Sequence, residues 1–198
     1  MNNNSTLPNL VLASSSPYRR ELLARLQIPF TCESPEIDES IVQDETAEYL
    51  VTRLATEKAR KTGSNHPGAI IIGSDQVVVL NNEILNKPGN HENALIQLQK
   101  LSNQTVTFYT GLCVLNSRRN SIHAECIPYI VKFRKLDTGE IERYLKKEKP
   151  YNCAGSFKSE ALGISLIDYM KGDDPTALIG LPLIRLCELL RNEGISIP

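Results

Sequence analysis

The sequence predicts an α/β protein built on a mixed sheet. Apolar runs of strand length alternate with segments in which apolar residues recur every three or four positions, which is the spacing of a helix face. Two long strand-like runs, 104–116 and 121–135, are separated only by a polar turn, which favours an antiparallel hairpin in the middle of the chain. Because a strict series of βαβ units contains no such hairpin, we expect parallel and antiparallel pairs in one sheet.

Three strands and two helices are expected in the first half of the chain. In order they are a strand at 9–13, a helix from residue 17, a strand at 30–33, a helix at 46–61 and a strand at 69–80. Pro17 suits the first position of its helix, because the N–H that proline lacks would be unpaired there. The run AIIIGSDQVVVL is polar in its centre, so it is either one long strand or two strands joined by a turn at Gly73 and Asp75.

The second half is expected to place the hairpin between helices. Its elements are a helix at 92–101, the two hairpin strands, a helix at 137–147, a strand at 163–169 and a helix at 181–192. Asp137 is a good N-cap, because its carboxylate can accept a hydrogen bond from the free N–H groups of the first turn.

The composition is that of an ordinary globular protein. Over 198 residues, 41% are hydrophobic and 23% are charged, so the chain can bury a core without disulfide or metal cross-links. The 22 Lys and Arg nearly balance the 23 Asp and Glu, which argues against a nucleic-acid partner held by bulk positive charge. No apolar run reaches the length of a membrane span. Residues 1–8 are polar and unlike a signal peptide, so we expect a flexible tail followed by a single domain at 9–198.

The cysteines and histidines do not form a known ligand pattern. There is no CxxC pair, and an odd number of cysteines suggests reduced, mostly buried thiols in a cytoplasmic protein. The five are Cys32, Cys113, Cys126, Cys153 and Cys187. The three histidines are scattered, and the P-loop, GxGxxG and GxSxG motifs are absent.

The segment ASSSPYRR at 13–20 joins a strand to a helix. Free N–H groups at a helix start, together with hydroxyl and guanidinium groups, favour an anion such as phosphate. Plain N-capping by serine beside solvated arginines is the alternative interpretation.

Two charged residues fall where burial is expected. At about 100° per residue, Lys58 lies on the same helix stripe as Ala47, Leu50 and Leu54, so it either snorkels to the surface or points into a cleft. Asp75 interrupts an apolar run, and a carboxylate there is costly unless it is paired or metal-bound. Unless it lies in a turn, Asp75 is therefore a candidate general base or metal ligand.

Three further segments carry weaker signals. The carboxylates of Glu36, Asp38 and Glu39 could hold Mg²⁺ together with substrate phosphates, or form an ordinary acidic loop. Lys87 before a proline is either a cation of the site or a solvated turn residue. In the segment CAGSFKSE at 153–160, glycine permits close backbone approach and Glu160 could accept hydrogen bonds from a base, although a structural loop is the default interpretation.

These segments together resemble the Maf family of nucleoside triphosphate pyrophosphatases. The similarity extends over about residues 9–193, and the order of the motifs is more specific than any one of them. The motifs are LASSSPYRRELL at 12–23, DE at 38–39, LATEKA at 54–59, GSDQV at 73–77, KP at 87–88, CAGSF at 153–157 and IGLPL at 179–183.

The resemblance implies a fold and a reaction. The expected fold is a bent mixed sheet with flanking helices and two lobes around a cleft, as in inosine triphosphatase-like enzymes, often as a homodimer. The expected reaction splits a nucleoside triphosphate into a monophosphate and pyrophosphate, with Mg²⁺ or Mn²⁺ neutralising charge. The resemblance also implies that Asp75 is the proton acceptor and a metal ligand, and that Glu39 is a second metal ligand. The phosphate-binding residues are then Ser14, Arg19, Lys58 and Lys87.

Three positions indicate the branch of the family. The chain has Tyr18, Gln76 and Glu160 where the dTTP/UTP branch typically has Arg, Thr and Gln, and it is most similar to the 7-methyl-GTP branch, which has an aromatic residue, Gln and Glu. Methylation at N7 makes guanine cationic, which suits an aromatic face and a carboxylate. The role implied is cytoplasmic clearance of modified nucleotides. A dTTP/UTP pyrophosphatase and a non-catalytic nucleotide-binding regulator of septum formation remain as alternatives.

Overall fold

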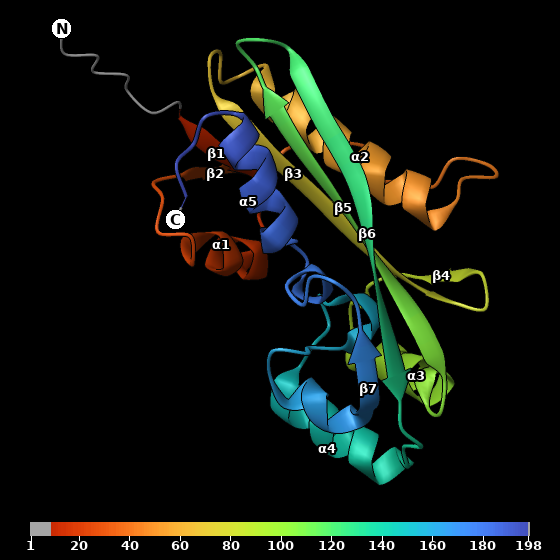
Figure 1. Cartoon of the computed structure of the whole chain (residues 1–198). Helices are drawn as coiled ribbons and strands as arrows, with labels where there is room; N and C mark the ends of the chain where they lie inside the picture. Colours follow the sequence, from red (N-terminus) through yellow and green to blue (C-terminus); the bar gives the residue numbers. More distant parts are fainter. Residues whose placement is uncertain (1–8, 198) are drawn as a thin grey trace, which may run out of the picture.

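A seven-stranded mixed sheet runs the length of the molecule and connects two lobes (Figure 1). The structure is a computed structural model, and it describes residues 9–197. The main path of the sheet has the order β2-β1-β3-β5-β6-β7, and β4 pairs with β3 beside this path. The strands are β1 (Leu10–Ala13), β2 (Thr31–Glu33), β3 (Ile70–Leu80), β4 (Glu83–Leu85), β5 (Thr105–Asn116), β6 (Ser121–Phe133) and β7 (Ile167–Lys171).

Helices cover the sheet at both ends. The α-helices are α1 (Pro17–Ala24), α2 (Ala47–Gly63), α3 (His91–Leu101), α4 (Thr138–Glu148) and α5 (Leu183–Asn192). Three 3₁₀ segments complete the chain: η1 (Ala154–Ser156), η2 (Leu162–Leu166) and η3 (Ala177–Ile179). As drawn in Figure 1, β1, β2, α1, α2 and α5 form an upper lobe, while α3, α4 and β7 form a lower lobe.

Three long strands pass through both lobes. β1 pairs in parallel with β2 and β3, whereas β3, β5, β6 and β7 are joined by antiparallel pairs. The β3–β5 ladder extends from Ile70 opposite Asn116 to Val79 opposite Thr107. One continuous ladder therefore supports both lobes, and the polar centre of β3 falls between them.

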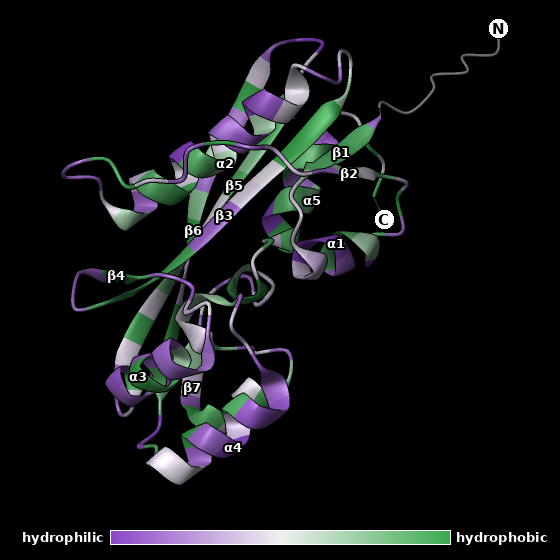
Figure 2. Ribbon diagram, turned by 180° about the vertical axis from the view of Figure 1, so that it is seen from behind, coloured by the Kyte–Doolittle hydropathy of each residue, from purple (hydrophilic) through white to green (hydrophobic). Residues whose placement is uncertain are grey.

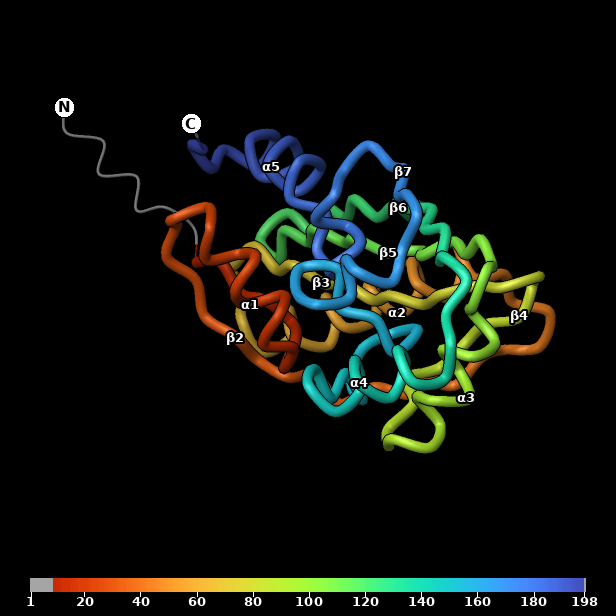
Figure 3. Tube along the Cα trace, turned by 90° about the horizontal axis from the view of Figure 1, so that it is seen from below, coloured from red at the N-terminus to blue at the C-terminus, as the bar shows by residue number. Residues whose placement is uncertain are grey.

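Each lobe has its own core. In the upper lobe α1 and α5 pack on one face of the sheet around Ile70 and Ile72, and α2 packs on the other face around Ile71. In the lower lobe α3 and α4 lie side by side (Figure 3) and enclose Phe108 and Phe133. Figure 2 shows hydrophobic residues gathered on the strands and on the helix faces turned toward them, as burial of apolar surface requires.

Two glycines let α2 lie directly on the sheet. A Cβ at Gly73 would stand 2.0 Å from the carbonyl oxygen of Ala55, and a Cβ at Gly111 would stand 2.1 Å from that of Val51. Real Cβ atoms do not approach backbone so closely, so only glycine permits this contact. Gly111 lies opposite Asp75 in the β3–β5 ladder, which places the buried face of α2 over this carboxylate.

The α/β class, the mixed sheet and the two lobes are confirmed, and most predicted elements lie within three residues of the observed ones. The run 69–80 is one strand, so the alternative of a turn at Gly73 and Asp75 is wrong. The strand expected at 163–169 begins only at Ile167, because η2 precedes it. The short strand β4 was not expected. The tail predicted at 1–8 lies outside the described residues.

The expectation that the cysteines are mostly buried is wrong. Only Cys113 is buried; Cys32 is exposed, and Cys126, Cys153 and Cys187 are half-buried. All five are free thiols. Across residues 9–197, every helix is too short or too polar to cross a membrane.

The Gly111→Ala substitution should destabilise the protein by about 3 kcal/mol, because the new Cβ forces α2 away from β5. Urea denaturation measures this as a lower midpoint. Gly139→Ala is the control, since its Cβ meets only the side chains of Asp137 and Arg143, which can move. Equal midpoints for the two variants would show that α2 does not depend on this contact.

Candidate active site

Two adjoining cavities lie where the lobes meet. The larger has a volume of about 350 Å³ and is lined mainly by the strand-to-helix junction 13–19, with Glu39 and Lys58. The smaller, of about 60 Å³, is lined by Gln76, Phe157 and Glu160 among others. Five residues line both cavities: Ser16, Tyr18, Arg19, Lys87 and Asn152. The two cavities are thus parts of one cleft, joined across the first turn of α1.

The serines at the junction have different tasks. Ser16 is the N-cap of α1, and its hydroxyl accepts a hydrogen bond from the Arg19 N–H at 3.4 Å. The Ser14 hydroxyl accepts from the Ser16 N–H at 3.1 Å and lies in the larger cavity with Ser15. N-capping is therefore confirmed for Ser16, while Ser14 and Ser15 face the space that a ligand would occupy.

Arg19 is positioned by a carbonyl from the far end of the chain. Its Nε donates to the Gly180 carbonyl at 2.8 Å, and the Ser74 hydroxyl donates to the same oxygen at 2.8 Å. Burial lowers the pKa of Arg19 from its usual value, although the negative charges of Asp75 and Glu39 act in the opposite sense. The guanidinium remains charged and presents a fixed cation to both cavities.

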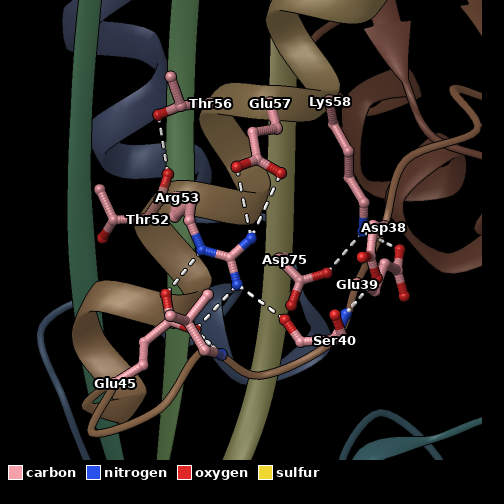
Figure 4. Close-up of polar contacts among 11 residues, drawn as sticks. Asp38, Glu39, Ser40, Glu45, Thr52, Arg53, Thr56, Glu57, Lys58 and Asp75 are labelled. Atoms are coloured by element: carbon pink, nitrogen blue, oxygen red, sulfur yellow. Dashed lines mark hydrogen bonds and ion pairs between the residues drawn. The ribbon is translucent and has the colours of Figure 1, made fainter.

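Lys58 bridges the carboxylates of Asp75 and Glu39 (Figure 4). Its Nζ lies 2.6 Å from Oδ1 of Asp75 and 2.6 Å from Oε1 of Glu39. Lys58 and Asp75 are buried, whereas the Glu39 side chain is 55% exposed. The alternative that Lys58 snorkels to the surface is therefore wrong. Asp75 does not line the larger cavity, and it adjoins that cavity through Lys58.

The charge of Glu39 is set by its neighbours. Partial burial on its own would raise the pKa of this carboxyl, but the hydrogen bond and charge of Lys58 outweigh it. The charges of Lys87 and Arg19 act in the same direction, so the pKa of Glu39 lies below its usual value. A carboxylate that stays ionised near neutral pH can bind a cation.

Arg53 fixes the loop that carries Glu39, and the sequence analysis did not identify it. Its Nε and Nη2 donate to Glu45 at 2.6 and 2.8 Å, and Nη2 also donates to the Ser40 carbonyl at 3.0 Å (Figure 4). Nη1 holds Glu57 on the same helix at 3.3 Å. The only sequence signal was the i,i+4 spacing of Arg53 and Glu57 on the predicted helix.

Gln76 is oriented by η3 and its neighbourhood. Its Nε2 donates to the carbonyls of Ala177 and Leu178 at 2.8 and 3.1 Å and to the Thr110 hydroxyl at 2.9 Å. These partners use the amide nitrogen, so the amide oxygen is the group that Gln76 can offer to a ligand in the smaller cavity.

Tyr18 lines both cavities. Burial raises the pKa of its hydroxyl far above the usual value, and a hydrogen bond to Cys153 adds to the rise. The phenol therefore stays neutral and can present its ring as an aromatic surface. Glu160, which is exposed, lies at the edge of the same smaller cavity.

The predicted site residues thus come together in one cleft. Asn152 also lines both cavities, and no signal in the sequence pointed to it. Ser14, Arg19, Glu39, Lys58 and Lys87 line the larger cavity. Neither Glu36 nor Asp38 lines either cavity, and Asp38 instead accepts a hydrogen bond from Ser40 within the loop.

Glu39 and Asp75 are the carboxylates available for a cation. Within residues 9–197, no three His, Cys, Asp or Glu side chains gather as a metal site. The carboxylates of Glu39 and Asp75, which both contact Lys58, nevertheless fit the way Mg²⁺ is held in proteins. Substrate phosphates and water would supply the other ligands. The donor set suits a metal that arrives with its substrate.

The fold and the cleft define an α/β protein with a larger cavity lined by Arg19, Lys58 and Lys87 and a smaller cavity lined by Gln76 and Glu160 among others. The chain belongs to the Maf family, because a profile described as "Maf-like protein" matches residues 9–193. This agrees with the resemblance found in the sequence.

Relatives named "7-methyl-GTP pyrophosphatase" are similar over nearly the whole chain. The relative from Pseudomonas savastanoi pv. phaseolicola is 57% identical and covers 97% of this chain and 100% of its own. The relative from Nitrosococcus oceani is 55% identical and covers 96% of each chain. Among solved structures, a HAM1 protein from Coxiella burnetii has a TM-score of 0.45 at 12% identity, covering 64% of this chain and 73% of its own.

Arg53→Met should speed amide exchange in the loop 38–45 about tenfold, because hydrogen bonds to charged groups contribute roughly 1.5–3 kcal/mol. Hydrogen–deuterium exchange with mass spectrometry measures this. Arg25→Met is the control, since the Arg25–Glu21 pair is 3.9 Å long and exposed. Unchanged exchange in the Arg53 variant would mean that another contact holds the loop.

Proposed function

We propose that this protein is a nucleoside triphosphate pyrophosphatase that hydrolyses 7-methyl-GTP to 7-methyl-GMP and pyrophosphate. The observation that carries the proposal is the single cleft in which three cations surround one cavity, and an aromatic ring and a carboxylate border the next. The names of relatives at 55–57% identity support the same substrate. The activity would remove modified nucleotides before they enter nucleic acid.

The larger cavity suits the triphosphate. Arg19, Lys58 and Lys87 place positive charge around it, and Ser14 adds a hydroxyl beside the start of α1. Helix N-termini and guanidinium groups are good phosphate ligands, since they donate several hydrogen bonds to oxygen anions. Phosphates bound here would bring the α-phosphorus toward Lys58 and Asp75.

Asp75 is the proton acceptor in this proposal. Water attacks the α-phosphorus, the bond from that phosphorus to the bridging oxygen breaks, and pyrophosphate leaves with the bonding electrons. Asp75 takes the proton of the attacking water, while Lys58 and Arg19 stabilise the negative charge of the phosphates. Lys58 donates to Oδ1 of Asp75 from α2, and this contact orients the carboxylate of the strand residue.

A divalent cation would be held by Glu39 and Asp75 together with the phosphates. Mg²⁺ or Mn²⁺ supplies charge neutralisation on the phosphate oxygens when bound. Glu39 reaches the site from a loop and Asp75 from a strand, so the two carboxylates approach the phosphates from different elements.

The smaller cavity suits the methylated base. N7 methylation gives guanine a positive charge, and the face of Tyr18 attracts cations with about 0.5–2 kcal/mol. Glu160 and the amide oxygen of Gln76 can accept hydrogen bonds from the N–H groups of guanine. A dTTP or UTP specificity is disfavoured, because Tyr18 replaces the arginine typical of that branch.

The proposal is tested by pyrophosphate release from 7-methyl-GTP, GTP, UTP and dTTP, each with and without Mg²⁺. We expect metal-dependent release with 7-methyl-GTP preferred. Preference for UTP or dTTP would support pyrophosphate release as the reaction but contradict the proposed role of Tyr18 and Glu160 in recognising 7-methylguanine. Folded protein that releases pyrophosphate from none of the four would leave a nucleotide-binding regulator as the better interpretation.

Asp75→Asn should reduce kcat by about 100-fold or more, which is within the range for a general base. The amide keeps the size of the side chain but cannot take the proton. Steady-state kinetics on 7-methyl-GTP measures the effect, and Asp168→Asn on the exposed surface of β7 is the control. A folded Asp75→Asn enzyme with near-normal turnover would exclude Asp75 from this role.

A further inference from the structure

A lysine lies against the ring of Tyr18. The Nζ of Lys158 stands over the ring, 5.5 Å from its centroid. Tyr18 lines both cavities, whereas Lys158 is not among the described residues that line either. The ammonium therefore lies over one face of the ring without lining either cavity, and the opposite face is the one left for a base.

Lys158 is held firmly in this position. Its backbone N–H donates to the Tyr144 hydroxyl at 3.1 Å, and a Cβ at Gly163 would stand only 2.3 Å from its carbonyl oxygen. Its Nζ forms an ion pair with Oε2 of Glu148 at 3.2 Å. Both side chains are largely buried, with 21% and 18% exposed, which distinguishes this lysine from a freely moving surface residue.

Glu148 is itself fixed at the end of α4. It is the last residue of that helix, and its Oε1 accepts a hydrogen bond from the Leu162 N–H at 3.4 Å. The carboxylate draws the ammonium of Lys158 toward α4 and offsets its charge. The two residues therefore form a unit that determines how much positive charge acts on that face of the Tyr18 ring.

A cation behind an aromatic ring weakens the ring's attraction for a second cation in front. The attraction is electrostatic and depends on the negative potential of the ring face, which Lys158 has already drawn on. The two positive charges also repel each other across the ring in a partly desolvated site. A neutral guanine in front of Tyr18 does not meet this repulsion.

We propose that Lys158 and Glu148 are specificity-determining residues that set the preference for a cationic base over a neutral one. Lys158 lowers the affinity of the cleft for 7-methylguanine relative to guanine, and Glu148 limits this effect by partly neutralising Lys158. The inference rests on the proposed function and adds two residues that do not touch the substrate. They act through Tyr18, so they are positioning and tuning residues and not catalytic ones.

The test uses the opposite signs expected for the two residues. Lys158→Met removes the charge and keeps most of the stem, so the ratio of kcat/KM for 7-methyl-GTP to that for GTP should rise at least about threefold. The change should lie in KM, with kcat for both substrates retained. Glu148→Gln leaves the ammonium without its counter-charge and should lower the same ratio. Lys146→Met on α4, where Lys146 pairs with Glu142 and is exposed, is the control and should leave the ratio unchanged.

Binding of the products provides a second readout. Calorimetric affinities for 7-methyl-GMP and GMP should shift in the same directions, and they can be measured whether or not a variant turns over. A Lys158→Met variant with an unchanged or lower ratio would overturn the inference. An equal loss of affinity for both bases in the two variants would also overturn it, because a purely structural role gives that result.

Failure of the proposed function is distinguishable from failure of this inference. Wild-type protein that releases pyrophosphate from neither 7-methyl-GTP nor GTP would refute the function alone, since the product affinities still report the ratio. Wild-type protein that prefers 7-methyl-GTP, combined with a Lys158→Met variant of unchanged ratio, would refute the inference alone.

Discussion

The buried carboxylate of Asp75 is the constraint on which the rest of the site depends. An ionised group in the middle of a strand is costly unless a charge and hydrogen bonds compensate it. Lys58 supplies that compensation from α2 at 2.6 Å, and it reaches Asp75 only because the helix backbone lies against glycine on β3 and β5. The same ammonium holds Glu39 at 2.6 Å, so the packing of one helix also positions the acidic loop.

A single loop near the C-terminus organises the other side of the cleft. Asp174 is 3% exposed and accepts hydrogen bonds from the Thr176 N–H at 2.9 Å and from the Ile184 N–H at 2.8 Å. The loop that it holds presents the Gly180 carbonyl to Arg19 and the carbonyls near η3 to Gln76. Arg19 and Gln76, the residues proposed to bind phosphate and base, are therefore aligned by one segment, 177–180, more than a hundred residues away from both in the chain.

The features that could be predicted from the sequence are those with a local cause. Helical periodicity placed Lys58 on a buried face, and a carboxylate within an apolar run singled out Asp75. The hydrogen bonds of Arg53 to the Glu39 loop and the position of Lys158 over the Tyr18 ring could not be predicted, because each depends on how separate segments pack together. The late start of β7 has a similar cause, since Gly163 packs against the backbone of Lys158 and η2 occupies the space of a strand.

In the proposed function, Tyr18 and Arg19 couple recognition of the base to recognition of the phosphates. They are consecutive residues, so their Cα atoms are separated by one peptide unit of about 3.8 Å. Arg19 is tied to the upper lobe and to Gly180, while the ring of Tyr18 contacts Lys158 of the segment beside the lower lobe. Under the proposed function, one turn of helix therefore sets the spacing between the base and the phosphates, and a ligand must match both cavities to contact both residues.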